Sequence, residues 1–545
     1  MKILLLEGAW EEIGEAFGKH LNHQARRSIE YMLSGSRRIA SHAAPDSPSK
    51  RLLFSAGLEL LFRLKALRPT NEREKSFFKG FEKSSGYGFR KVLSYFYAPD
   101  ASSYVMSLAD RILKRSTPPV LLGCSSFVAL PGTTKDGTTI HARNLDYIGG
   151  KYWEKGHCIA VLRPRGELAS VNVISSGVFC PGITAVNEEG IGISLHMNFT
   201  RDVGFKNRPI TSTVLEITSK ARKLADAIEI ARKNPPMGGW TIVVSSAKEG
   251  DAVAIEMSSS KTDIIHPDNS LIYYTNAYLS PAMRNTEYAP SYIWVENNHA
   301  RLSRLKELLF RNLGNISPQV AAEILSDTLD PTIERETALG HTISNATNIS
   351  SAIFNYEGDE IWVSDSPVPA NRGSFKGYKI SSLLSGKPEP IGEIRGKRLS
   401  EHKERAFRSF VEACFEWEES ASPRKAHGHL LLAAETDPDE PLYLFNLALM
   451  LAKMGEYKQS LSVLKQLYEE ADLNPTRRAQ IILWYARLSD VCSLRERALE
   501  LYREVIRMRA PIDLLKRAEK GLQKPFSPKE LRKVDILPFI ADIIE

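Results

Sequence analysis

Cysteine and metal-binding motifs are scarce in this sequence. Only five cysteines occur in 545 residues, and no two of them form a CxxC pair. A disulfide framework and a structural zinc site are therefore not expected. The histidine pairs His20/His23 and His427/His429 lack cysteine or acidic partners at ligand spacing, so they predict no metal site.

Long apolar runs and cofactor fingerprints are also missing. No run approaches the roughly 18 residues of a membrane-spanning helix, so no transmembrane segment is expected. The apolar stretch in MKILLLEG is too short for a secretory signal, which favours the cytoplasm. Gly190-Ile-Gly192 lacks the third glycine of a dinucleotide-binding turn, and no phosphate loop occurs, so no cofactor is expected.

The composition is that of a folded protein of two to four domains. Hydrophobic residues make up 43% and charged residues 25% of the chain. The net charge of +7 is concentrated at residues 1–123, which hold 20 Lys or Arg and 12 Asp or Glu. Nucleic acid or anionic lipid could attract such a segment, but its basic residues alternate with apolar ones at helical spacing. Solvated helix faces explain this pattern better, and no nucleic-acid partner is expected.

The predicted type of secondary structure changes twice along the chain. Helical patterns predict helices near 8–33, 51–67, 70–84 and 100–115. From Cys124 onward, strand-like runs predominate, with Asp136-Gly137 as a hairpin signal and one long helix predicted over 212–233. Further helices are predicted near 299–312 and 318–329, and residues 385–400 suggest a linker. Strands flanked by helices predict an α+β fold of antiparallel sheets covered by helices.

The C-terminal part is predicted to be entirely helical over residues 402–520. The stretch at 442–475 resembles a tetratricopeptide repeat, with Leu447-Ala448 in its first helix, Gly455 and Tyr457 at the turn, and Asn474-Pro475 as terminator. Neighbouring stretches look like parts of two more repeats, although the spacing of 37 residues between Pro438 and Pro475 departs from the usual period of about 34. A generic helical bundle is the alternative.

Cys124 stands out because it follows Gly123 and begins a strand-like run. On a hairpin that turns at Asp136-Gly137, the returning strand brings Arg143 and Asp146 near Cys124. A cysteine beside a cation is more thiolate-like and more nucleophilic, so Cys124 is a candidate nucleophile. The alternative is a buried structural cysteine.

The segment CSSFVALPGTTKDGTTIHARNLDY resembles the start of the choloylglycine hydrolase/acid ceramidase superfamily of N-terminal nucleophile (Ntn) hydrolases. It is most similar to the peptidase C45 branch, which includes acyl-CoA:6-aminopenicillanic acid acyltransferase-like proteins. Similarity continues in order over residues 1–380. The matching motif positions are Cys124, Ser125, Ser126, Phe127, Asp136, Gly137, His141, Arg143, Asn144, Asp146 and Tyr147.

The resemblance implies a four-layer αββα fold that cleaves itself between Gly123 and Cys124. It implies three segments: 1–123 helical and propeptide-like, 124–395 the catalytic core, and 396–545 a tetratricopeptide-like helical domain. Cys124 would be the nucleophile and its freed α-amine the general base. The remaining implied site residues are Arg143 near the thiol, Asp146 orienting the amine, Asn276 in the oxyanion hole, Asn198 lining the site, and Arg301 as a distal arginine.

Several alternatives stay open at this stage. Arg304 competes with Arg301, and both asparagines could be turn residues. Ala277 stands where many relatives carry an aromatic residue or histidine, which leaves the substrate class undetermined. The leading hypothesis is hydrolysis of linear amide bonds in N-acylated small molecules or short acyl-peptides through a Cys124 thioester. Acyl transfer from the same thioester is one alternative.

A second alternative is a non-catalytic scaffold that binds a protein partner through the helical domain. Its weakness is that every expected catalytic position is filled. Residues 1–395 are expected to fold, self-cleave and keep amidase activity without the helical domain. If that domain packs over the pocket mouth as a lid, its removal should alter the acyl-chain preference and leave self-cleavage intact.

Overall fold

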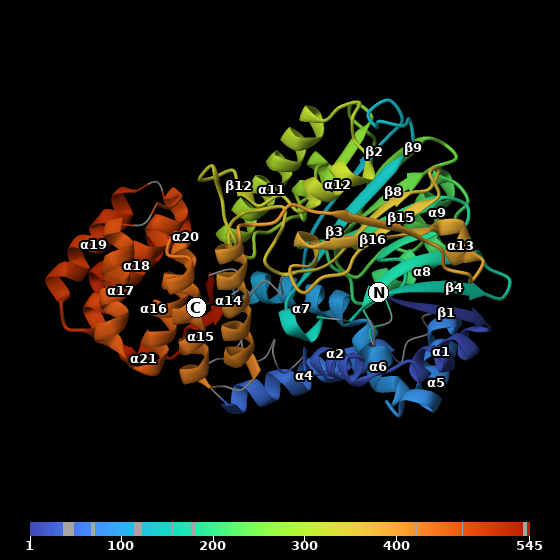
Figure 1. The fold of residues 1–545 in the computed structure, drawn as a ribbon. Coiled ribbons are helices and arrows are strands. Elements are labelled where there is room, and N and C mark those ends of the chain that lie inside the picture. Colours follow the sequence, from blue (N-terminus) through green and yellow to red (C-terminus); the bar gives the residue numbers. More distant parts are fainter. Residues whose placement is uncertain are drawn as a thin grey trace.

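The structure is a computed structural model that describes residues 1–35, 37, 48–66, 71–113, 122–154, 156–175, 178, 180–419, 422–470, 472–508, 510–537 and 542–544. Two β-sheets form the right-hand part of the molecule in Figure 1, with the N-terminal helices below them and the C-terminal helices at the left. No helix in the described part of the chain combines the length and apolar character needed to cross a bilayer.

An eight-stranded sheet has the spatial order β1-β4-β5-β6-β7-β8-β9-β10. Its β1–β4 pair is parallel and its other pairs are antiparallel. The strands are β1 (Lys2–Gly8), β4 (His157–Pro164), β5 (Ser170–Ser175), β6 (Thr184–Asn187), β7 (Ile191–Asn198), β8 (Gly239–Ser246), β9 (Asp251–Met257) and β10 (Thr262–Ile265).

A seven-stranded antiparallel sheet has the spatial order β11-β2-β3-β14-β15-β16-β17. The strands are β11 (Leu271–Tyr274), β2 (Leu122–Ala129), β3 (Ile140–Tyr147), β14 (Asn348–Asn355), β15 (Glu360–Ser364), β16 (Ser374–Lys379) and β17 (Pro390–Arg395). The two sheets pack face to face through alternating apolar residues, such as Val161 and Val171 against Phe354 and Val363.

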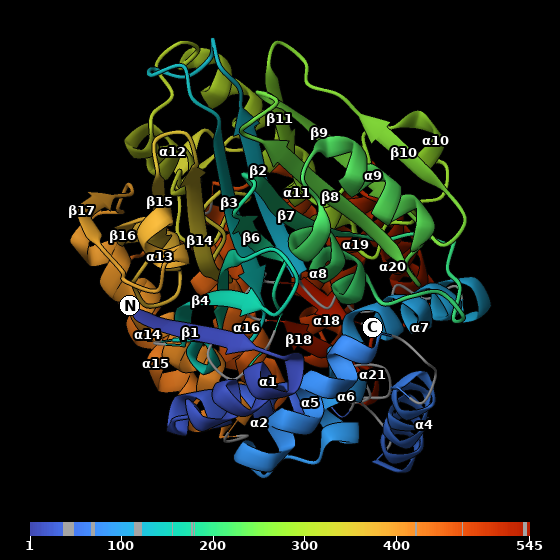
Figure 2. The same ribbon diagram turned by 90° about the vertical axis from the view of Figure 1, so that its right-hand side faces the viewer.

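Helices cover the outer face of each sheet and complete four layers. On the eight-stranded sheet lie α8 (Ile210–Lys220) and α9 (Leu224–Lys233), seen in front of it in Figure 2. On the seven-stranded sheet lie α11 (Tyr292–Arg311) and α12 (Pro318–Leu325). The expected α+β class with αββα layering is therefore confirmed. Short elements fill the connections: α10 (Pro281–Arg284), α13 (Ile380–Leu384), β12 (Leu329–Asp330), β13 (Arg335–Glu336), and two 3₁₀ helices, η1 (Gly150–Tyr152) and η2 (Ala370–Arg372).

The N-terminal helices pack on the β1–β4 end of the eight-stranded sheet. They are α1 (Trp10–Lys19), α2 (His23–Leu33), α4 (Pro48–Ala66), α5 (Glu72–Ser85), α6 (Phe89–Phe96) and α7 (Ala98–Leu113). Helices α1 and α5 cross so closely that a Cβ on Gly14 would lie 1.9 Å from the Phe77 carbonyl oxygen. Glycine is therefore required at this crossing.

Three sequence expectations differ from the structure. Residues 8–33 form two helices, because the Asn22 side chain accepts the Ala25 N–H and starts α2. The predicted helix over 212–233 also breaks in two, where Asn187 binds the last carbonyls of α8. The linker expected over 385–400 contains β17, an edge strand paired with β16.

The strand β1 was not expected either. It lies inside the segment interpreted as helical and propeptide-like, yet it extends the central sheet through parallel pairing with β4. Its short apolar run precedes a helix directly, so the sequence shows too few alternating positions to indicate a strand.

The C-terminal helices pack in sequence order beside the sheets (Figure 1). They are α14 (Glu401–Glu419), α15 (Pro423–Thr436), α16 (Pro441–Met454), α17 (Tyr457–Glu470), α18 (Pro475–Val491), α19 (Arg495–Arg507), α20 (Ile512–Gln523) and α21 (Pro528–Leu531), followed by β18 (Asp535–Leu537) and β19 (Asp542–Ile544). A helical domain is thus confirmed, with Gly455 in a left-handed conformation between α16 and α17. Its assignment as a tetratricopeptide array stays a prediction.

One apolar cluster joins the helical domain to the core formed by the two sheets. Leu339 and Ala346 of the core belong to the same cluster as Phe407 and Tyr443 of the helices. Polar contacts add to this junction, for example Thr476 Oγ1, which donates to Glu296 Oε1 at 3.2 Å.

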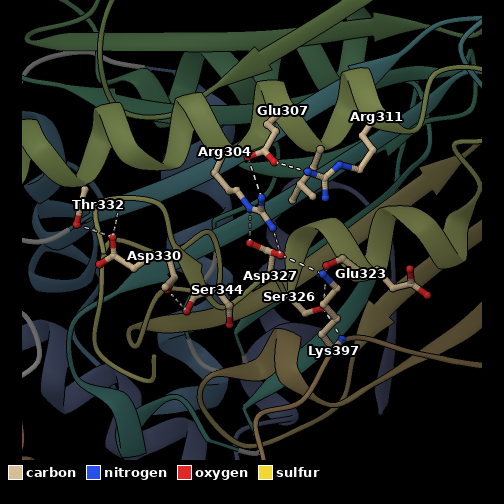
Figure 3. Close-up of polar contacts among 12 residues, drawn as sticks. Arg304, Glu307, Arg311, Glu323, Ser326, Asp327, Asp330, Thr332, Ser344 and Lys397 are labelled. Carbon is tan, nitrogen blue, oxygen red and sulfur yellow. Dashed lines mark hydrogen bonds and ion pairs between the residues drawn. The ribbon is translucent and has the colours of Figure 1, made fainter. Parts of the chain in front are cut away.

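A buried ion-pair network fastens the start of the helical segment to the core (Figure 3). The Asp327 carboxylate accepts Arg304 Nε at 2.9 Å and Nη2 at 3.0 Å, and it also binds Lys397 Nζ at 3.0 Å. Only 2% of the Asp327 side chain is exposed. Asp327 is the buried carboxylate partner of Arg304, whose other carboxylate partner, Glu307, is half exposed.

We expect Asp327→Asn to lower the free energy of unfolding by about 3 kcal/mol, because it leaves buried Arg304 without its carboxylate. The measurement is urea denaturation followed by tryptophan fluorescence. Glu307→Gln is the matched control, since Glu307 binds the same guanidinium but is 45% exposed. It should cost less than about 1 kcal/mol. Equal losses for the two variants would contradict the assigned role of Asp327.

Candidate active site

The register of the β2–β3 hairpin decides which side chains meet. Gly123 lies opposite Asp146, and Ser126 lies opposite Arg143. Successive residues of a strand face opposite sides of the sheet. Cys124 and Arg143 therefore face the eight-stranded sheet, whereas Asp146, three residues beyond Arg143, faces α11.

The Cys124 thiol contacts a fully buried arginine. Arg143 Nη2 donates to Cys124 Sγ at 3.3 Å and also to the Leu195 carbonyl oxygen on β7. Its Nη1 donates to the Ile183 carbonyl oxygen and to Thr184 Oγ1. Arg143 thus spans the space between the sheets and holds the sulfur from one side.

Burial and the positive charge of Arg143 shift the pKa of this thiol in opposite directions. Burial raises the pKa of Cys124 above its ordinary value, and neighbouring Arg143 only partly offsets the rise. The thiol is therefore protonated at neutral pH in the uncut chain. Chemistry at Cys124 needs a base to remove that proton.

The backbone of Cys124 is held as firmly as its side chain. Its N–H donates to Asn276 Oδ1 at 2.7 Å, and its carbonyl oxygen accepts Arg301 Nη1 at 2.7 Å. Arg301 also binds Ser125 Oγ at 2.9 Å and Asn298 Oδ1 at 2.8 Å. Of the two arginines that the sequence left as alternatives, Arg301 reaches Cys124.

Arg304 lies one turn farther along α11 and binds Asp327 instead, as Figure 3 shows. The sequence could not separate the two arginines, because both lie on the buried face of the same helix.

Asp146 lies beside Gly123 and not beside the sulfur. A Cβ built on Gly123 would be 2.9 Å from Asp146 Oδ2, so a larger residue would collide with the carboxylate. Asn348 Nδ2 donates to Oδ1 at 3.0 Å, whereas buried Oδ2 has no hydrogen-bond partner among the described residues. An unpaired buried carboxylate oxygen next to the Gly123–Cys124 bond can accept a new donor there.

Asn198 offers the complementary group, an unpaired donor. Its Oδ1 accepts Thr241 Oγ1 at 2.9 Å, while its buried Nδ2 has no partner in the part of the chain that the structure describes. Asn198 shares a face of β7 with His196, whose Nε2 lies 2.6 Å from Ser126 Oγ, two residues after Cys124. The Asn276 amide nitrogen instead binds the Met197 carbonyl oxygen at 3.0 Å.

Two buried histidines were not predicted as part of the site. His141 binds Ser194 Oγ and Ser245 Oγ, each at 2.8 Å, and burial lowers its pKa to about 3. Burial also lowers the pKa of His196 well below its ordinary value. Both are neutral near pH 7 and link the two sheets through hydrogen bonds. The sequence signals for them were the inclusion of His141 among the positions that match the family motif and the place of His196 two residues before Asn198.

Asn348 and the neighbouring pair Asn297 and Asn298 are also contacts of the site that the sequence did not indicate. They bind Asp146 and Arg301, respectively. They lie 173 to 224 positions from Cys124 in sequence, and no motif connects them to it.

A pocket of about 550 Å³, partly open to solvent, lies at the Gly123 end of β2. The first turns of α11 form one wall and the chain between β13 and β14 forms another. A third wall comes from α18 of the helical domain. The lining residues are Gly123, Ser291, Ile293, Trp294, Asn297, Leu339, Gly340, His341, Asn345, Ala346, Thr347 and Arg477. The described residues include no group of three or more His, Cys, Asp or Glu placed to hold a metal ion.

Residues 133–364 match the model of the acyl-coenzyme A:6-aminopenicillanic acid acyl-transferase family. The match spans Arg143, Asp146, Asn198, Asn276 and Arg301 but begins after Cys124. It supports the Ntn superfamily, and chemistry at an acyl or amide bond, in general terms. The peptidase C45 branch stays a prediction.

No curated protein sequence matches the chain. Among solved structures, the chain is similar to a Caenorhabditis elegans N-acylethanolamine-hydrolyzing acid amidase (NAAA) ortholog. That similarity has 16% identity and a TM-score of 0.31, over 43% of this chain and 92% of the other.

Asp146→Asn should not destabilise the uncut chain at pH 7, and we expect its melting temperature to rise. Burial raises the pKa of Asp146 in the folded state, so the folded chain loses stability as pH increases through the carboxyl range. The gain should therefore be larger at pH 7 than at pH 4. Thermal denaturation at both pH values, in a Cys124→Ala background, measures it.

Asp513→Asn, at an exposed position of α20, is the control and should change little at either pH. A loss of stability for Asp146→Asn at pH 7 that disappears at pH 4 would contradict this expectation. It would mean that attraction to Arg301 and Arg143 outweighs the cost of burial.

Proposed function

We propose that this protein is a self-processing cysteine amidohydrolase that cleaves linear amide bonds of N-acylated small molecules or short acyl-peptides. One observation carries the proposal. The Gly123–Cys124 bond lies between Arg143 at the sulfur and the unpaired Asp146 oxygen beside Gly123. A purely structural cysteine would not need an arginine at its sulfur or a buried, half-satisfied carboxylate at its preceding peptide bond.

Self-cleavage begins when Cys124 Sγ attacks the Gly123 carbonyl carbon. The carbon–nitrogen bond breaks, the thiol proton passes to the Cys124 nitrogen, and a thioester links Gly123 to Sγ. Water hydrolyses this thioester, which leaves a carboxylate on Gly123 and restores the thiol. Asp146 Oδ2 then accepts a hydrogen bond from the new α-amine, and Asn276 Oδ1 keeps the contact it already makes with that nitrogen.

The free α-amine then serves as the base that the buried thiol needs. Its reference pKa of about 7.7–8.0 suits proton transfer near neutral pH. Cys124 attacks the substrate carbonyl, the protonated amine gives its proton to the departing nitrogen, and water releases the acyl group. Asn198 Nδ2 is the donor for the oxyanion, in place of Asn276. Loss of one such donor costs roughly 2.7–4 kcal/mol of barrier in other enzymes.

Acyl transfer is the second candidate, favoured by the family whose model matches residues 133–364. The same thioester would be resolved by an amine rather than by water. The helical domain is proposed to be a tetratricopeptide-like unit that could also bind a protein partner. A scaffold without activity would have no use for the paired groups around Cys124.

The purified protein should consist of two fragments, residues 1–123 and 124–545. Intact mass spectrometry under denaturing conditions would detect both, while gel filtration should show that they stay together, because β1 is part of the central sheet. Cys124→Ala should remain a single 61.0 kDa chain. Cys158→Ala, at another buried cysteine, is the matched control and should cleave normally. An uncut wild-type chain that hydrolyses amides would contradict the α-amine mechanism.

Asn198→Leu should lower kcat for amide hydrolysis by about 100-fold, because it removes the proposed oxyanion donor. Thr241→Val is the control, since it removes only the hydroxyl that binds Asn198 Oδ1. A full rate for Asn198→Leu would contradict the role of Asn198.

Product analysis with an added primary amine separates the two candidate activities. An excess of the new amide over the free acid would favour acyl transfer.

A further inference from the structure

A second cavity, whose volume of about 340 Å³ includes space open to solvent, adjoins the candidate substrate pocket at the junction with the helical domain. The two cavities share Leu339, Gly340, His341 and Arg477. The core contributes β12, β13 and the chain after them, and the helical domain contributes the starts of α16 and α18. The second cavity is therefore placed to receive a part of a ligand that lies beyond the first.

Arg335, on β13, lines this cavity, and one edge of its guanidinium group is unpaired. Its Nε and Nη2 atoms are buried and have no hydrogen-bond partner among the described residues. Buried donors of this kind are normally satisfied, because an unmade hydrogen bond to a charged group is costly.

The contact between Arg304 and Asp327 shows which kind of group binds this edge of a guanidinium. Arg304 uses Nε and Nη2 to bind the two oxygens of Asp327 at 2.9 and 3.0 Å (Figure 3). Two parallel N–H groups match the two oxygens of one carboxylate. The free edge of Arg335 has this geometry, and no carboxylate among the described residues is hydrogen-bonded to it. Asp437 and Glu440 lie near enough to attract Arg335 electrostatically but do not bind this edge.

The acidic side chains that line the cavity are engaged elsewhere or lie at its rim. Asp330 accepts hydrogen bonds from Thr332 and from the His341 N–H. Glu440 accepts from Thr337 and the Leu442 N–H, and burial raises its pKa. Asp472 is exposed. Arg477 of α18 adds a second guanidinium that lines both cavities.

We propose that Arg335 binds a carboxylate at the far end of the substrate, so that the preferred substrates are acylated amino acids or short acyl-peptides with a free C-terminus. This inference rests on the proposed amidase function and narrows its substrate class. It also gives the helical domain a role, since Arg477 closes the same site from α18.

The test compares each acyl-peptide with its C-terminal primary amide, for one to three residues after the scissile bond. The wild type should favour the free carboxylate by roughly 10- to 100-fold in kcat/KM, as for one charge-assisted bidentate contact. Each added residue lengthens the ligand by up to about 3.5 Å, so one length should give the largest preference.

Arg335→Met should abolish this preference by raising KM for the carboxylate substrate, with the amide substrate unchanged. Arg335→Lys should keep only part of this preference, because lysine carries the charge but lacks the two parallel N–H groups of a guanidinium. Arg395→Met, at an exposed arginine on β17, is the control and should behave as the wild type. Equal activity on the two substrates, or an equal loss on both in Arg335→Met, would overturn the proposal.

Calorimetric binding of the same acyl-peptides to uncut Cys124→Ala, with and without Arg335→Met, separates this proposal from the proposed function. Arg335-dependent binding in a protein that hydrolyses no amide would support the carboxylate site and reject the amidase. Hydrolysis without carboxylate preference, together with equal binding of acid and amide, would reject the site and leave the amidase standing.

Discussion

The antiparallel pairing of β2 with β3 is the constraint on which the candidate site depends. It sets Gly123 opposite Asp146 and Ser126 opposite Arg143. A slip of one residue would exchange the two faces and turn Cys124 away from Arg143. β11 pairs with β2 and β14 with β3, so the hairpin lies inside a larger sheet that opposes such a slip.

Three charged side chains lie buried around this hairpin, and their hydrogen bonds explain how the fold tolerates them. Arg143 and Arg301 donate to carbonyl and amide oxygens of several strands and helices. Such contacts offset a desolvation cost of several kcal/mol per ion. Asp146 is less well satisfied, since one oxygen stays unpaired. An apolar core would be more stable, so this arrangement is better explained by chemistry at Cys124 than by stability.

The pocket extends the site beyond the four-layer core. Its walls come from α11, from the chain before β14 and from α18, so Gly123 and Arg477, 354 positions apart in sequence, lie around one cavity. The helical domain and the two-sheet core also share an apolar cluster. The helical domain therefore lines the same pocket as the core, and a lid role for it stays a prediction.

Local patterns in the sequence were enough to predict the α+β class, the hairpin after Cys124 and the helical C-terminal part. Alternation, a turn signal and helical periodicity each act over a few residues, so they can be read without a structure. The Cys-first motif likewise singled out Cys124, Arg143 and Asp146. Only the tertiary structure decided the rest: β1 joining the sheet, Arg301 rather than Arg304 reaching Cys124, and Arg335 meeting Arg477 at one cavity. These depend on contacts between distant segments, because burial and pairing energies are set by neighbours in space and not by neighbours in the chain.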